Sequence, residues 1–429
     1  MVWTTGARLT PDALIGGVQR FTTADGVALH DTLLRRAHAY IDRIHSARCR
    51  DSTPKHFVRM STSGIGNDLN QAVRSLALAL AFGERQLVLL PPHPRNTASR
   101  MHHATDASHP WHWMPDTPLS AIVRLSSCQE YMQSRRFDAV LNRDERVCSA
   151  FRRMGSPHLA TSCTETTASK WSEGFRAEHI PPVFRPLGLM WWFQALTTYL
   201  IRIRDPLRHD LLAHPALREL WNRLPQRAHV QSRGRQRPDG EAIACVAPSA
   251  AYCATRRCYP DGILPLAAFD VGLHMRLGDA CRRARTSRTC LTNLDDALRI
   301  LHDHGLRRGD LFLATDSEAI VAQAQAVSAT SPFRIHYLNL SRARYDTAMP
   351  NELRSTNRTA DLLDLLLEVL LLSRSSVIAG TMQSNVPRLA LQWRVTLPGS
   401  RVLVSLDNRE WCTRSSCRWN YTAMVDGTV

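Results

Sequence analysis

Residue types suited to phosphate chemistry lie at the end of one predicted strand. In DVGLHMRLGD (270–279), apolar and polar residues alternate, so His274 and Arg276 share one face of the strand. A guanidinium is always charged and offers a planar fork that fits phosphate oxygens. Asp279, which follows Gly278, can hold that fork or contact a ligand hydroxyl. The segment predicts an anion-binding strand end, although an arginine paired with an aspartate in an ordinary loop has the same pattern.

A second polar cluster opens a predicted helix. In GTMQSNVPRLAL (380–391), Ser384 and Asn385 precede a proline, and Arg388 lies one turn inside. The amides at a helix start can bind phosphate, but an ordinary helix cap has the same residues. The anion-site interpretation is favoured because this cluster and Arg276 both fall at strand ends of one predicted sheet.

Acidic residues follow in two further segments. Asp316 ends the predicted strand DLFLATDS (310–317). Asp361, Asp364 and Glu368 are spaced i, i+3 and i+7, so they share one face of a leucine-rich helix. Two interpretations stay open for that face: a solvated stripe, or carboxylates directed at a bound nucleotide.

Other chemistry-bearing segments predict less. The histidine-rich stretch MHHATDASHPWHW (101–113) matches no metal-ligand spacing and is interpreted as a polar loop, so no metal is predicted. The chain has no nucleophile elbow, Walker loop or zinc-protease helix. The Trp191-Trp192 pair is interpreted as core or inter-domain packing rather than a sugar platform.

The elements that would position these residues alternate between strand and helix. Predicted strands are 55–61, 85–92, 269–276, 310–317 and 376–381. Predicted helices are 64–83, 188–205, 293–305, 318–327, 359–374 and 385–393. This order predicts an α/β fold with a parallel sheet covered on both faces, in which ligands bind at the carboxyl ends of strands.

The length of 429 residues predicts two domains. The boundaries we expect are an N-terminal extension (1–50), a first α/β domain on the acceptor side (51–230), a linker (231–265), a nucleotide-sugar-binding domain (266–400) and a tail (401–429).

The net charge of +16 comes almost entirely from scattered arginines, so we predict no nucleic-acid partner. No apolar stretch approaches the roughly 18 residues of a membrane span, and the N-terminus lacks the pattern of a signal peptide. Membrane attachment is expected only through an anchor not visible in this chain.

Cysteines and glycosylation sequons favour a secretory compartment. The cysteine count of eleven is odd, so at least one is unpaired within the chain. The local disulfides that the spacing allows are Cys253–Cys258 and Cys412–Cys417. The sequons are Asn339-Leu-Ser, Asn357-Arg-Thr and Asn420-Tyr-Thr.

Taken in order, these segments resemble the fucosyltransferases that include core α1,6-fucosyltransferase, the bacterial nodulation fucosyltransferase and, more distantly, the protein O-fucosyltransferases. The resemblance spans residues 55–412. It rests on GIGNDLNQAVRSLALALAFGERQLVLL, LMWWFQALTTYLIR, VGLHMRLGD, LFLATDS and LSRSSVIAGTMQSNVPRLA. It implies a GT-B-like fold, in which two Rossmann-like domains face a cleft and the later one binds GDP-fucose.

The resemblance also implies residue roles. His274 and Arg276 match a His-x-Arg motif whose arginine contacts the donor diphosphate, and Asp279 matches the acidic residue after it. Glu368 best matches the acidic contact to the donor, with Asp364 as second choice. The expected catalytic residues are Arg276 and Asp279. The expected donor-binding residues are His274, Arg276, Gly278, Asp316, Asp364, Glu368, Ser384, Asn385 and Arg388.

The implied reaction is inverting transfer of fucose to a glycan or glycoprotein in the Golgi lumen, without a metal or other cofactor. Two positions depart from the core α1,6 enzymes, which carry an arginine where this chain has Leu277 and a lysine where it has Ala280. The acceptor and linkage therefore stay open. Two alternatives also remain: the same fold with another nucleotide sugar, and a non-catalytic glycan- or nucleotide-binding protein.

Overall fold

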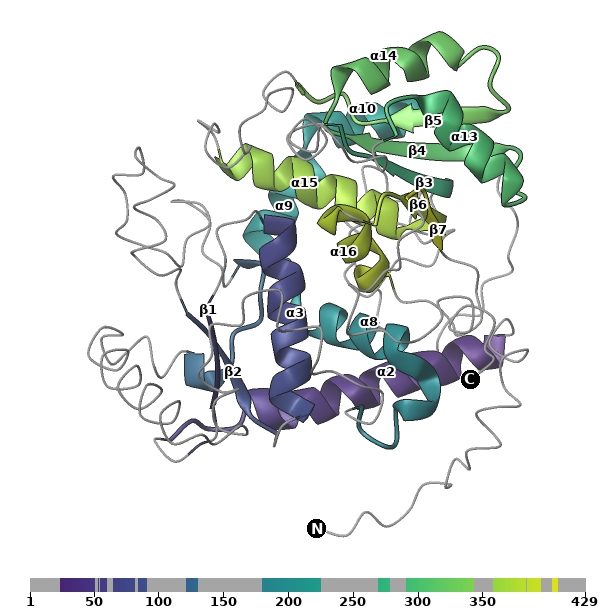
Figure 1. Ribbon diagram of the computed structural model, residues 1–429. Helices are drawn as coiled ribbons and strands as arrows, with labels where there is room; N and C mark the ends of the chain where they lie inside the picture. The colour runs from purple at the N-terminus through teal and green to yellow at the C-terminus, as the bar shows by residue number, and fades with distance from the viewer. Residues whose placement is uncertain are drawn as a thin grey trace, which may run out of the picture.

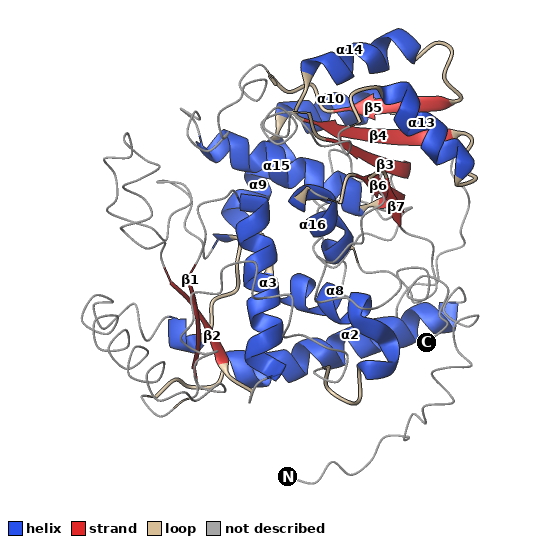
Figure 2. Cartoon of the chain, viewed as in Figure 1, coloured by secondary structure: helices blue, strands red, loops and turns tan. Residues whose placement is uncertain are grey.

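The computed structural model describes residues 24–50, 53, 55–59, 65–81, 84–90, 121–129, 180–224, 269–277, 291–342, 358–382, 384–394 and 403–407. These residues form two parallel sheets with helices packed around them (Figure 1; Figure 2). The α/β class expected from the sequence is confirmed, with a parallel sheet in each half of the chain.

The first half contains a β-α-β unit, as the sequence predicts. Strands β1 (Lys55–Arg59) and β2 (Gln86–Leu90) pair in parallel, and α3 (Ile65–Ala81) connects them. Leu69, Val73 and Leu76 recur at helical spacing on α3 and are all fully buried. Helix α2 (Ala24–His45), which the sequence does not predict, contacts α8 and β2.

The single helix predicted over residues 188–205 is wrong in its last turn. Helix α8 (Gly188–Leu200) ends because Ile201 is extended and forms a bridge with Val123. The chain restarts as α9 (Asp205–Ala213) and α10 (Pro215–Arg223), each with a proline at its start. Helix α9 contacts α15 of the second half, and Arg223 of α10 donates to the carbonyl of Tyr337 there (3.0 Å).

The second half is a five-stranded parallel sheet in the order β5-β4-β3-β6-β7. Its strands are β3 (Phe269–Met275), β4 (Gly309–Thr315), β5 (Phe333–Tyr337), β6 (Ser375–Gly380) and β7 (Leu403–Ser405). Its helices are α13 (Leu294–Asp303), α14 (Glu318–Val327), α15 (Arg358–Ser373) and α16 (Asn385–Trp393). Helices α13 and α14 cover one face, and α15 and α16 cover the other (Figure 1).

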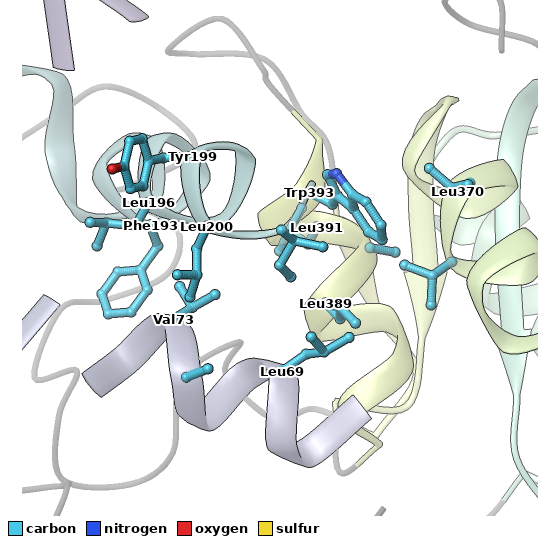
Figure 3. Close-up of a cluster of buried hydrophobic side chains, with 14 of the residues drawn as sticks. Leu69, Val73, Phe193, Leu196, Tyr199, Leu200, Leu370, Leu389, Leu391 and Trp393 are labelled. Carbon is cyan, nitrogen blue, oxygen red and sulfur yellow. The ribbon is translucent and has the colours of Figure 1, made fainter. Parts of the chain in front are cut away.

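The two halves share one hydrophobic core. Helix α16 contacts α15 of its own half and both α3 and α8 of the first half. Figure 3 shows Leu69 of α3, Leu196 of α8 and Leu370 of α15 around Leu389 and Trp393 of α16. Trp192 of α8 is completely buried and stacks on Phe184, with ring centroids 5.5 Å apart, so the interpretation of the tryptophan pair as core is confirmed.

A disulfide joins Cys49, beyond α2, to Cys128. The local pairs Cys253–Cys258 and Cys412–Cys417 lie outside the described residues and stay predictions. None of the helices that the structure describes combines the length and the hydropathy needed to cross a bilayer.

Candidate functional site

The candidate site lies where the strand order of the larger sheet reverses direction. From β3 the chain passes outward to β4 and β5, then returns to place β6 on the other side of β3. In open α/β sheets, ligands bind outside the carboxyl ends of strands at such a switch point. His274 of β3 pairs with Gly380 of β6 here. The two polar clusters predicted from the sequence therefore emerge side by side, although they are about a hundred residues apart in the chain.

His274 forms part of the packed wall of the site. His274 is 4% exposed. Its burial and the nearby charge of Arg276 lower the pKa of the imidazole to about 3, so the ring is neutral. A Cβ added at Gly380 would lie 3.4 Å from Cβ of His274 and 3.0 Å from Cβ of Pro387. The absence of a side chain at Gly380 lets the first turn of α16 lie close against the end of β6.

Arg276 leaves the end of β3 beside Asp316 at the end of β4. Its Nε lies 3.8 Å from Oδ2 of Asp316, while the backbone N–H of Leu277 donates to Oδ1 (2.9 Å). One carboxylate thus ties the two strand ends together and faces the guanidinium. Because 29% of the Arg276 side chain is exposed, the guanidinium can still meet a ligand.

The start of α16 supplies the second part of the site. Ser384 is the N-cap residue, and its hydroxyl accepts from the N–H of Val386 (3.4 Å). Pro387 has no N–H, so this helix end offers one amide fewer than usual to an anion. Arg388 lies one turn inside and is 7% exposed. A bound phosphate would therefore depend more on Arg276 than on the helix amides.

The solvated-stripe interpretation of the acidic helix face is wrong for two of its residues. The side chains of Asp364 and Glu368 are 11% and 14% exposed. Burial raises the pKa of Glu368 to about 8; the neighbouring carboxylates Asp316 and Asp364 raise it too, and Arg342 opposes them. Glu368 is therefore largely protonated at neutral pH.

Sequence reasoning missed two residues of this cluster. Arg342 is 2% exposed, donates to the carbonyls of Thr315 (2.8 Å) and Leu338 (2.8 Å), and places Nη2 3.7 Å from Glu368. His214, between α9 and α10, lies 3.1 Å from Asp364. Neither belongs to a motif, and each reaches the cluster only through tertiary packing.

The first half reaches the same edge through the start of α3. A Cβ added at Gly66 would lie 3.6 Å from Cβ of Asn385. The buried amide of Asn70 donates to the carbonyls of Gly66 (2.9 Å) and Asn385 (3.1 Å). The glycine turn of the first half is thus fixed directly against the start of α16.

Some predicted residues lie outside the described part of the chain: Gly278, Asp279, Ala280 and the histidine-rich segment 101–113. Within the described ranges, no group of three or more histidine, cysteine, aspartate or glutamate side chains is arranged to hold a metal ion. The structure brings together His274, Arg276, Asp316, Ser384, Asn385 and Arg388 from three strand ends, with Asp364 and Glu368 on α15 behind Asp316.

Fold and site together define an α/β protein with polar and charged residues at the switch point of a Rossmann-like parallel sheet. No protein-family model matches the chain, and no curated protein matches it in sequence. Among solved structures, a mutant of Arabidopsis thaliana FUT1 in complex with GDP is similar in fold, with a TM-score of 0.36 and 9% sequence identity. The match covers 92% of this chain and 79% of that one. A TM-score of 0.36 is too low to argue from, so function is inferred from the residues themselves.

Proposed function

We propose that the chain is an inverting glycosyltransferase that transfers fucose from GDP-fucose to a glycan or glycoprotein. The observation that carries the proposal is the convergence of Arg276 and the start of α16 at the switch point of a parallel sheet. A diphosphate fits this edge because it needs a fixed cation and amide donors at its oxygens. The choice of GDP-fucose rests on the resemblance of the ordered sequence segments to fucosyltransferases.

Arg276 would act on the leaving group. In the proposed reaction, an acceptor hydroxyl attacks the anomeric carbon of fucose, the bond to the β-phosphate oxygen breaks, and its electron pair leaves with GDP. Negative charge therefore grows on the β-phosphate in the transition state. A guanidinium already placed beside Asp316 at the end of the strand can stabilise that charge with little reorganisation. Loss of one such donor costs about 3 to 4 kcal/mol of activation free energy in comparable sites.

The other residues would have supporting roles. His274 would form a buried, neutral part of the wall of the site, and Asp316 would keep a negative charge beside Arg276. Asp279, three residues beyond Arg276, is the second residue for which we propose a catalytic role. We propose that no metal is required, because arginine takes over the neutralisation of phosphate.

We also propose that the protein works in the lumen of the secretory pathway, specifically the Golgi. Two observations favour this compartment: the Cys49–Cys128 disulfide, which persists in oxidising surroundings, and the exposed sequon residue Asn339.

The test of the donor is thermal stabilisation of the purified chain by GDP-fucose, GDP-mannose, UDP-glucose and free GDP. We expect GDP and GDP-fucose to raise the melting temperature of the wild type, and Arg276→Ala to abolish the rise. Arg299→Ala is the matched control. Arg299 is an exposed arginine on α13, which covers the face of the sheet opposite to α15 and α16. Stabilisation by UDP-glucose alone would replace GDP-fucose with another donor.

Turnover separates an enzyme from a binding protein. GDP release from GDP-fucose in the presence of mixed glycan acceptors is expected for the wild type. We expect about a hundredfold or greater loss of that rate in Arg276→Ala. Stabilisation by GDP without any release of GDP would instead identify a non-catalytic nucleotide-binding protein. No stabilisation by any of the four nucleotides would overturn the proposal.

A further inference from the structure

His214 reaches the site from a segment that the sequence motifs do not include. It lies between α9 and α10, and its side chain is 15% exposed. The imidazole makes no capping bond to α10, so its helix-boundary position does not explain its orientation. It turns instead toward α15, against which α9 packs.

The hydrogen bond of His214 has a defined direction. Its Nε2 lies 3.1 Å from Oδ1 of Asp364, while its Nδ1 is buried and has no hydrogen-bond partner in the described part of the structure. With the proton on Nε2, that nitrogen donates to Asp364 and Nδ1 is left as a buried acceptor without a partner, whereas the opposite tautomer would bury an unmatched N–H and set two acceptors against each other. The network thus assigns Nε2–H as donor to the Asp364 carboxylate.

A chain of neighbours leads from that carboxylate to Arg276. Glu368 is one helical turn beyond Asp364 on α15, and the two carboxyl groups act on each other electrostatically. Glu368 is also influenced by Asp316, which faces Arg276. Arg342 stands on the other side of Glu368, with 3.7 Å between Nη2 and Oε1.

The charges in this cluster act on one another. In the described part of the structure, Arg276 faces Asp316 and Arg342 faces Glu368, while the charges of Asp316 and Asp364 both act on Glu368. Negative charge added behind Asp316 would weaken the attraction of Arg276 for a diphosphate. Glu368 is neutral while it is protonated. The hydrogen bond from His214 stabilises the negative charge of Asp364 on the side of α15 that faces α9.

We propose that His214 is a positioning residue of the donor site, which fixes the Asp364 carboxylate and, through Glu368 and Asp316, keeps Arg276 available to a diphosphate. This inference rests on the proposed function. It assigns no contact between His214 and the substrate.

The proposal predicts how nucleotide binding depends on pH. GDP affinity of the wild type should fall as the pH rises through about 8, because Glu368 then ionises behind Asp316. Without a donor at position 214, the negative charge of Asp364 loses its hydrogen-bond partner and acts more strongly on Glu368, which then holds its proton more tightly. In His214→Phe, the fall in affinity should therefore move to higher pH, by about one unit.

The experiment is calorimetric titration with GDP between pH 6 and 9.5 for wild type and three variants. His214→Phe should move the alkaline midpoint, whereas His214→Gln should restore it because the amide N–H still donates to Asp364. His209→Phe is the matched control, because His209 is an exposed histidine on α9. An unchanged midpoint in folded His214→Phe, or a wild-type affinity that does not fall at alkaline pH, would overturn the proposal.

A second readout separates this inference from the proposed function. If the wild type binds no guanine nucleotide, the proposed function fails. The pH dependence of unfolding of the unliganded protein still reports whether His214 acts on Asp364 and Glu368. His214→Phe should move that profile to higher pH by a similar amount. A profile identical to that of the wild type would show that the imidazole only fills space.

Discussion

Replacing Glu368 with glutamine should stabilise the protein, and the gain should depend on pH. Glutamine has nearly the same shape as the protonated carboxyl and can donate its amide protons to the neighbouring Asp316 or Asp364. In the wild type at neutral pH, Glu368 is protonated in the folded state and ionised in the unfolded chain. Folding must therefore take up a proton, which lowers the free energy of unfolding. The variant has no proton to hold, so this cost disappears.

The magnitude follows from the pKa of Glu368. Burial raises it from 4.5 to about 8, so the folded state retains a proton that the unfolded state loses across this window. Stability from this group is complete below pH 4.5 and is lost progressively up to pH 8. At about 1.4 kcal/mol per pKa unit, the gain for Glu368→Gln should be near zero at pH 4.5, about 2 kcal/mol at pH 6 and at most about 5 kcal/mol at pH 8. The last value is an upper bound, since the surroundings relax around an ionised carboxylate.

The assay is urea unfolding of wild type and Glu368→Gln at pH 5, 6.5 and 8, with the free energy of unfolding taken at each pH. Glu219→Gln is the matched control, because Glu219 is an exposed glutamate on α10 and should give a small, pH-independent difference. A gain for Glu368→Gln that is equal at pH 5 and pH 8, or a loss at pH 8, would refute the assignment of Glu368 as a buried protonated group.

Three further predictions concern the halves, the metal and the compartment. Asn70→Ala should lower the free energy of unfolding by about 1 to 3 kcal/mol in urea unfolding, because the carbonyls of Gly66 and Asn385 lose a buried donor; an unchanged stability would show that water replaces the amide. Fucose transfer should proceed at full rate in excess EDTA, and a rate restored only by a divalent cation would contradict phosphate neutralisation by Arg276. Protein secreted from a eukaryotic host should shift in mass on treatment with an N-glycosidase, and Asn339→Gln should reduce the shift; an unaltered shift would remove Asn339 as a modification site.

Much of the fold could be predicted because its signals are local. The apolar spacing of Leu69, Val73 and Leu76 predicts α3, and the alternation around His274 predicts β3. The proximity of Arg276 to the start of α16 could also be predicted, since the carboxyl ends of parallel strands meet at one edge of the sheet. The end of α8 could not be predicted, because the extended conformation of Ile201 depends on a bridge to Val123.

The charged cluster behind the site could be predicted only in part. The spacing of Asp364 and Glu368 places them on one helix face, but spacing does not tell whether that face meets water or protein. Their burial depends on α9, which brings His214 across 150 positions of sequence, and on Arg342, which binds carbonyls rather than a motif partner. Contacts of this kind leave no periodic signal.

Helix α16 is part of the second half in chain order, but its apolar side chains are buried against helices of both halves. An isolated second half would expose the side of α16 that packs on α3 and α8, and an isolated first half would expose the matching apolar residues. Independent unfolding of one half would therefore expose apolar surface on both. The two halves should melt in one cooperative transition, and a fragment cut within 225–268 should yield pieces that associate rather than separate domains.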